Sequence, residues 1–115
     1  QGTNDAGLGN TNSLGKLEIT AANSSSIVIE FSNPSELSDN ASTPNTIGFT
    51  PDYSGNTTDD AATSTDLNTS SSNTKTVSGS GLYYIYFGGT LEGNDIDGAT
   101  TGSYDATITA TINYE

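Results

Sequence analysis

The chain contains no cysteine, histidine, methionine or tryptophan, and these absences exclude much of the chemistry that proteins perform. Without cysteine there is no thiolate nucleophile, no disulfide framework and no thiolate ligand for zinc. Without histidine there is no Ser-His-Asp triad. Only two of the 115 residues are Lys or Arg, whereas a nucleic-acid-binding surface needs clustered basic residues that displace counterions. We therefore expect neither an enzyme nor a nucleic-acid-binding protein.

Long apolar runs are missing as well. No stretch approaches the roughly 20 apolar residues needed to cross a bilayer, so we expect no membrane insertion. The 14 acidic residues occur at an ordinary frequency, and the scarcity of basic residues is what gives the net charge of −12. Such a surface repels anionic membranes, DNA and acidic polysaccharides, and it attracts cations.

Small polar residues dominate what is present, with 16 serines, 19 threonines and 12 asparagines. Only 30% of the residues are apolar, and low hydrophobicity with a high net charge is also typical of disordered chains. However, six tyrosines and three phenylalanines are present, and they lie in short apolar runs that alternate with period two. This pattern predicts a folded β protein with a thin core.

Several segments show strand patterns. Residues 16–21 alternate apolar and polar side chains, and residues 27–31 place Ile27, Ile29 and Phe31 on one face of a second strand. The short polar gap between them favours a hairpin. A third short strand is expected at 46–50, ended by Pro51. Residues 52–73 have almost nothing to bury, which indicates a long loop or strands held mainly by backbone pairing.

The strongest apolar run, at 82–87, predicts a central strand covered on both faces, and 106–114 alternates most regularly. No segment is typical of an amphipathic helix. The predicted fold class is therefore all-β, an immunoglobulin-like or pilin-like two-sheet β-sandwich. We expect two parts, a flexible or strand-donating arm over residues 1–15 and the sandwich domain over 16–115.

Two acidic pairs are candidate Ca²⁺ ligands. Asp95 and Asp97 precede a glycine and resemble the start of a calcium loop, but the later ligand positions of the helical-hand pattern are filled by alanine. A site built from oxygen atoms alone would need a further acid, such as Asp59 or Asp60. The alternative is a solvated turn, where Asn, Asp and Gly are favoured in any case.

Four asparagines occupy N-glycosylation acceptor sequences, and these are Asn23, Asn40, Asn56 and Asn68. This composition yields about that number of such sequences by chance, so surface glycans are compatible with the sequence without being indicated by it.

Tyrosine is concentrated in the second half of the chain. Tyr83, Tyr84, Tyr86, Tyr104 and Tyr114 would suit a sugar-stacking platform, but core or interface positions are the simpler interpretation. Strand alternation places Tyr84 and Tyr86 on one face.

The last third of the chain carries a recognisable series of short motifs: Gly88-Gly89-Thr90-Leu91, then Gly102-Ser103-Tyr104, then an alternating Thr-rich strand that closes on Tyr114. This series resembles a family of secreted bacterial and archaeal surface domains, of unknown function, that are similar to pilin-like β-sandwiches. The match covers residues 82–115 well and 16–50 in outline. The resemblance implies export, a cell-surface or filament role and no enzymatic activity.

The first strand expected in such domains is replaced here by a Gly- and Asn-rich arm with little to bury beyond Ala6, Leu8 and Leu14. One interpretation is that the arm pairs with a neighbouring subunit as a donor strand, and the other is a disordered N-terminus. Head-to-tail repetition of such a contact makes a filament. The residues expected at the acceptor side are Tyr84, Tyr86, Ile108 and Ile112.

The leading functional hypothesis is a structural subunit of an extracellular filament or pilus, a homopolymer assembled by strand donation. The alternative is a monomeric cell-surface adhesion or carbohydrate-binding module, stabilised by Ca²⁺ at the sites named above. A concentration-dependent size distribution would separate the two.

Overall fold

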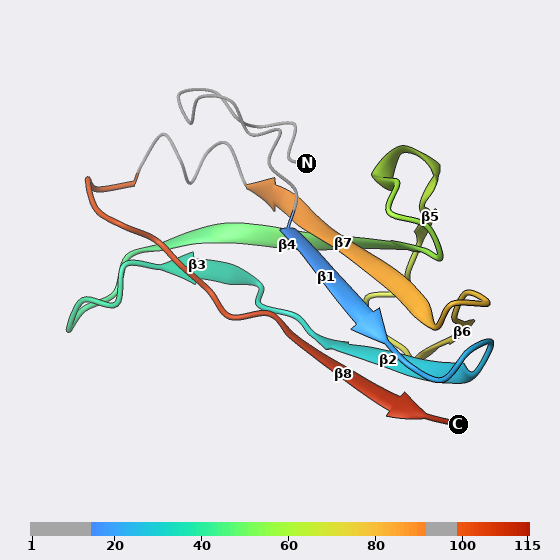
Figure 1. The fold of residues 1–115 in the computed structure, drawn as a ribbon. Coiled ribbons are helices and arrows are strands. Elements are labelled where there is room, and N and C mark those ends of the chain that lie inside the picture. Colours follow the sequence, from blue (N-terminus) through green and yellow to red (C-terminus); the bar gives the residue numbers. More distant parts are fainter. Residues whose placement is uncertain (1–14, 92–98) are drawn as a thin grey trace.

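The computed structural model describes residues 15–91 and 99–115, and Figure 1 shows their arrangement. They form strands and one 3₁₀ turn, η1 (Ala61–Thr63). The strands are β1 (Gly15–Thr20), β2 (Ser26–Ser32), β3 (Glu36–Ser38), β4 (Thr46–Asn56), β5 (Thr65–Asp66), β6 (Asn73–Thr76), β7 (Leu82–Leu91) and β8 (Thr109–Tyr114). In these ranges no helix is long and apolar enough to cross a membrane.

The strands pair into two antiparallel sheets. The large sheet has the order β1-β7-β4-β3, with β5 also paired to β4, and the small sheet has the order β6-β2-β8. Buried residues of both sheets pack together in one cluster, including Ile27 and Ile29 of the small sheet and Tyr53 and Ile85 of the large one. The fold is therefore the all-β, two-sheet sandwich that the alternating pattern predicts.

The register between β1 and β7 separates the two faces of the large sheet. Leu17 lies opposite Ile85, and these side chains face the small sheet. The intervening positions face outward, with Lys16 opposite Tyr86 and Glu18 opposite Tyr84. Tyr83 to Tyr86 are all buried, so β7 is covered on both faces as its sequence predicts.

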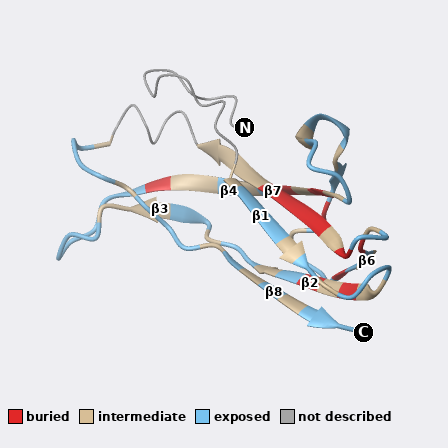
Figure 2. Ribbon diagram, viewed as in Figure 1, coloured by how far each residue is buried: buried red, intermediate tan, exposed pale blue. Residues whose placement is uncertain are grey.

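The core is small and lies mainly over β7 and the neighbouring parts of β2 and β4 (Figure 2). At its border the Phe31 and Tyr53 rings stack, with centroids 3.8 Å apart and planes 6° apart. The Tyr53 hydroxyl donates to Asn33 Oδ1 at 2.8 Å, which satisfies the polar end of this buried ring. By contrast, every residue of β1 and β8 is half-buried or exposed.

The expected hairpin between the first two strands is wrong. β1 pairs with β7 and β2 pairs with β6 and β8, so the chain crosses from one sheet to the other at Ala21–Ser25. At this corner the Ala21 amide donates to the Gly81 carbonyl and the Ser24 amide to the Ser78 carbonyl. These bonds tie the corner to the turn before β7 in place of a two-strand ladder.

Pro51 does not end the third predicted strand, because β4 continues through it to Asn56. Pro51 lies between the part of β4 that pairs with β3 and the part that pairs with β5. A residue without an N–H is tolerated there, since the side of β4 away from β7 has no ladder partner at that point among the described residues. The segment 52–73 therefore contains strands held by backbone pairing, as well as η1.

The last strand begins at Thr109, three residues later than the alternation starts. Before it, Asp105 forms an isolated bridge with Ser38 of β3, which links the approach to β8 with the far edge of the large sheet.

In the Gly88-Gly89 pair, Gly89 lies under the Phe49 ring, where a Cβ atom would have no room. This close approach gives the motif a packing role.

Candidate functional site

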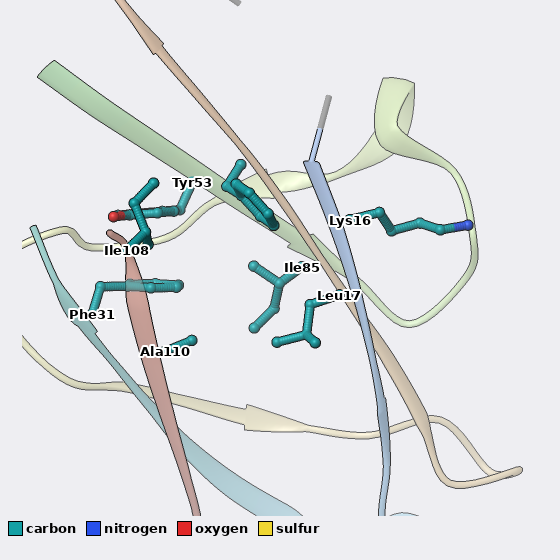
Figure 3. Close-up of a pocket in the computed structure, with 8 residues that line it drawn as sticks. Lys16, Leu17, Phe31, Tyr53, Ile85, Ile108 and Ala110 are labelled. Atoms are coloured by element: carbon teal, nitrogen blue, oxygen red, sulfur yellow. The ribbon is translucent and has the colours of Figure 1, made fainter. Parts of the chain in front are cut away.

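An apolar groove lies between the edge strands β1 and β8. It is a cavity of about 250 Å³ between the two sheets (Figure 3). It is lined by Lys16, Leu17, Phe31, Tyr53, Ile85, Phe87, Ile108 and Ala110. Apart from Lys16 and the Tyr53 hydroxyl, every lining side chain is apolar, so the groove is suited to apolar side chains and unsuited to a charged ligand.

The groove lies between an edge strand of each sheet. β1 is the last strand of the large sheet and β8 the last of the small sheet, and neither has a second ladder partner among the described residues. Ile108, Ala110 and Ile112 alternate with exposed threonines, and each of the three is half-buried. An additional strand at this position would cover them.

The exposed large hydrophobic residues of the described ranges lie on these same two strands. Leu17 of β1 is 38% exposed and Tyr114 of β8 is 66% exposed. Both residues lie on the inner faces of their sheets, because each pairs with a buried core residue. Leu17 is opposite Ile85, and Tyr114 is opposite Ile27. Apolar groups left uncovered along two adjacent open edges are typical of a surface that receives another chain.

Lys16, the basic residue beside the groove, is held on the outer face of the sheet by a polar cluster with Asp59 and Tyr86. Lys16 Nζ contacts Asp59 Oδ2 at 2.8 Å, and the Tyr86 hydroxyl donates to Asp59 Oδ1 at 2.9 Å. Figure 3 shows the Lys16 side chain extending away from the apolar lining residues. The Lys16 side chain therefore lies outside the apolar part of the groove, and its ammonium group contacts the loop around Asp59.

These contacts shift the pKa values of all three groups. The hydrogen bond from Lys16, followed by that from Tyr86, lowers the pKa of Asp59. The same hydrogen bond raises the pKa of Lys16. Burial, together with the adjacent Asp59 carboxylate, raises the pKa of Tyr86 to about 12. At neutral pH the cluster is a charged ion pair with a neutral phenol.

The candidate calcium ligands are not brought together within the described residues. Asp59 is occupied by Lys16 and Tyr86, and Asp60 caps η1 by accepting from the Ala62 amide and the Thr63 hydroxyl, each at 3.0 Å. In the ranges 15–91 and 99–115, no three acidic side chains lie close enough to hold a metal ion. Asp95 and Asp97 lie outside the described residues.

The four expected acceptor residues lie on different faces. Ile108 lines the groove, and Ile112 lies on the same face of β8. Tyr84 and Tyr86 are buried on the outer face of the large sheet, away from the groove, where they share a face with Lys16 and Asn56. The expected donor residues Ala6, Leu8 and Leu14 lie outside the described residues.

The tyrosines of the described ranges do not form an exposed platform. Tyr83, Tyr84 and Tyr86 are buried, and the Tyr104 hydroxyl donates to the Thr100 carbonyl at 2.9 Å. Tyr114 is the exposed one, at the end of β8.

The side-chain amides of two of the four glycosylation acceptor asparagines, Asn40 and Asn56, donate hydrogen bonds to other residues. The Asn56 amide donates to the Asp60 carbonyl and to Thr63 Oγ1, each at 2.9 Å, and the Asn40 amide donates to Asp105 Oδ1 at 2.9 Å. Asn23 and Asn68 are exposed.

Sequence reasoning did not find Leu17, Phe31, Phe87 or Ala110 as groove residues. Their alternation marks them as inward-facing, but nothing local shows that the sheet above them ends. Comparisons of the chain with protein-family models, with curated proteins and with solved structures give no match. The functional argument therefore depends on the groove itself.

Proposed function

We propose that the protein is a structural subunit of an extracellular filament or pilus, assembled head to tail by donation of a β-strand from one subunit to the next. In this proposal the sandwich is an incomplete pilin-like or immunoglobulin-like domain, and its self-association is its function. The observation that carries the proposal is the apolar groove between two edge strands that lack a second ladder partner among the described residues. A strand inserted there pairs its main chain with an open edge and buries its side chains against the groove.

The donor in this proposal is the segment 1–14, which precedes β1. Fourteen extended residues span about 46 Å at roughly 3.3 Å each, and the molecule itself is 48 Å long. The segment therefore has the length to reach a neighbouring subunit and lay down a strand there.

Charge supports the same pairing. Copies of a chain with a net charge of −12 repel one another, and this repulsion is smallest where the surfaces in contact carry few charges. Asp5 is the only charged side chain in residues 1–14, and none occurs from Ala106 to Tyr114. The segment carries one charged side chain and β8 carries none, so both have few charges for a strongly acidic protein.

The extracellular, cell-surface location belongs to the same proposal. It is supported by the resemblance of the Gly88-Gly89-Thr90-Leu91 and Tyr104 motifs to those of secreted surface domains. Labelling of intact cells with an antibody against the sandwich tests it, because an extracellular filament is labelled without permeabilisation.

A pair of substitutions in the donor segment tests assembly. Leu8→Asp places a charge on an apolar donor position, whereas Thr11→Asp adds the same charge on the opposite face of an extended strand. We expect the unchanged protein and Thr11→Asp to form filaments in negative-stain electron microscopy, and Leu8→Asp to remain monomeric. Filaments from Leu8→Asp at the unchanged yield would refute donation through this segment. Monomers of the unchanged protein at every concentration would refute the structural role and favour the adhesion module.

A further inference from the structure

We infer that the incoming strand hydrogen-bonds to β8 rather than to β1, and that Leu8 of a second copy fills the cavity beside Ala110. This inference rests on the proposed function and makes it specific. It names the edge that is extended, the side chain that enters and the residue beside which it packs.

The two edges of the groove differ in the protection they carry. β1 presents Lys16 and Glu18, and charged side chains, lysine above all, are the usual means by which an edge strand resists pairing with another chain. β8 has the sequence Thr-Ala-Thr-Ile-Asn-Tyr, with no charge, no proline and no glycine. Its threonines, isoleucine and tyrosine also favour strands. The open backbone of β8 is the less protected template.

The side chains along β8 leave a gap at one position. Ile108 and Ala110 both line the groove, and Ala110 is the smallest side chain in the lining. A cavity of about 150 Å³ with apolar walls accommodates a benzene ring, so the 250 Å³ found here has room for a leucine side chain. In residues 1–14, Ala6 and Leu8 share one face of an extended strand. Leu8 is the larger of the two, so it is the side chain suited to this gap.

The absence of native cysteine allows the pairing edge to be mapped with engineered disulfides. Gly7→Cys stands on the outward face of a strand whose Leu8 points inward. It is combined with a second cysteine at one outward position of β8 (Thr109, Thr111 or Asn113), or at one of β1 (Glu18 or Thr20). Cysteines on neighbouring strands form a disulfide only when their Cα atoms lie within about 7 Å. Each double variant is assembled, oxidised and run on a denaturing gel without reductant, beside an electron micrograph of the same sample.

The inference predicts covalent ladders from at least one β8 combination and only monomers from both β1 combinations. Ladders from a β1 combination, or filaments without a ladder from any β8 combination, overturn it while leaving strand donation standing. A disulfide-bonded monomer that migrates faster than its reduced form also overturns it, because the segment then occupies its own groove. Absence of filaments from the cysteine-free protein refutes the proposed function itself, and the inference with it.

A second variant tests the gap at Ala110 directly. Ala110→Leu fills the cavity from within, so we expect filaments to be lost while the melting temperature of the monomer stays the same or rises. Ala62→Leu, on the exposed 3₁₀ turn, is the matched control and should assemble normally. Normal assembly of Ala110→Leu refutes the inference. If Ala110→Leu lowers the melting temperature instead, the disulfide map decides.

Discussion

Replacement of Leu17 by alanine should weaken assembly more than a similar change elsewhere, and the structure gives the expected size of the effect. Burying a whole leucine side chain contributes about 1.5–3 kcal/mol. Leu17 is 38% exposed in the isolated subunit, so about 0.6–1.1 kcal/mol of this contribution is still to be gained when an incoming strand covers it. At about 1.4 kcal/mol for each tenfold change in an equilibrium constant, Leu17→Ala should raise the concentration of unassembled subunit about three- to sixfold.

The assay is sedimentation of filaments at equilibrium, followed by measurement of the subunit that stays in solution. Leu37→Ala is the matched control, because Leu37 is half-buried on β3, at the opposite edge of the large sheet from β1. Both variants should lower the stability of the monomer to urea, but only Leu17→Ala should change the soluble concentration. An equal soluble concentration for Leu17→Ala and the unchanged protein would show that no strand covers Leu17 in the filament, and the argument from the groove would fail.

Three further predictions concern the stability of the subunit. The pKa of Tyr86 is about 12 in the folded protein, against about 10 for an unperturbed phenol, so its contribution to stability is complete below pH 10 and is lost between pH 10 and 12. Tyr86→Phe should therefore flatten the fall of the melting temperature over that range. Asn73→Asp should cost about 1–3 kcal/mol in urea unfolding, because the buried Asn73 amide donates to the carbonyls of three residues; an unchanged midpoint would contradict this. Gly89→Ala should cost about 1–3 kcal/mol, since its Cβ would overlap the Phe49 ring, whereas Gly79→Ala, with open space around it, should be nearly neutral in the same titration.

The strands with a clear apolar pattern could be predicted from the sequence. Alternation at 27–31 places Ile27 and Ile29 in the core, and the continuous run at 82–87 identifies the strand that is covered on both faces. These patterns are local, and they follow directly from which side of a strand each residue occupies.

Three strands and the sheet order could not be found in this way. β3, β5 and β6 are short and carry few apolar residues, so backbone pairing with β4 and β2 creates them rather than a pattern of their own. Alternation also does not say which sheet a strand joins, which is why β1 and β2 looked like a hairpin. The sequence places the end of β4 too early, at Pro51. A proline ends a strand only where its missing N–H would have donated a ladder hydrogen bond.

Part of the candidate site could also be predicted from the sequence, because one of its strands has a local apolar pattern. The alternation of Ile108, Ala110 and Ile112 shows that β8 has an apolar face. Whether that face is covered depends on where the opposite sheet ends, and this is a property of the whole topology. The order β1-β7-β4-β3 leaves β1 at the edge, and only this arrangement reveals Leu17 and the gap beside Ala110.

The central claim is that the groove between β1 and β8 holds a strand from a neighbouring subunit. A cryo-electron microscopy reconstruction of the native filament tests it most directly. The account predicts one additional strand in every groove, hydrogen-bonded to β8, with density for Leu8 beside Ala110 and a continuous chain leading to the β1 of the adjacent subunit. An empty groove, or a groove filled by the subunit's own residues 1–14, would contradict it.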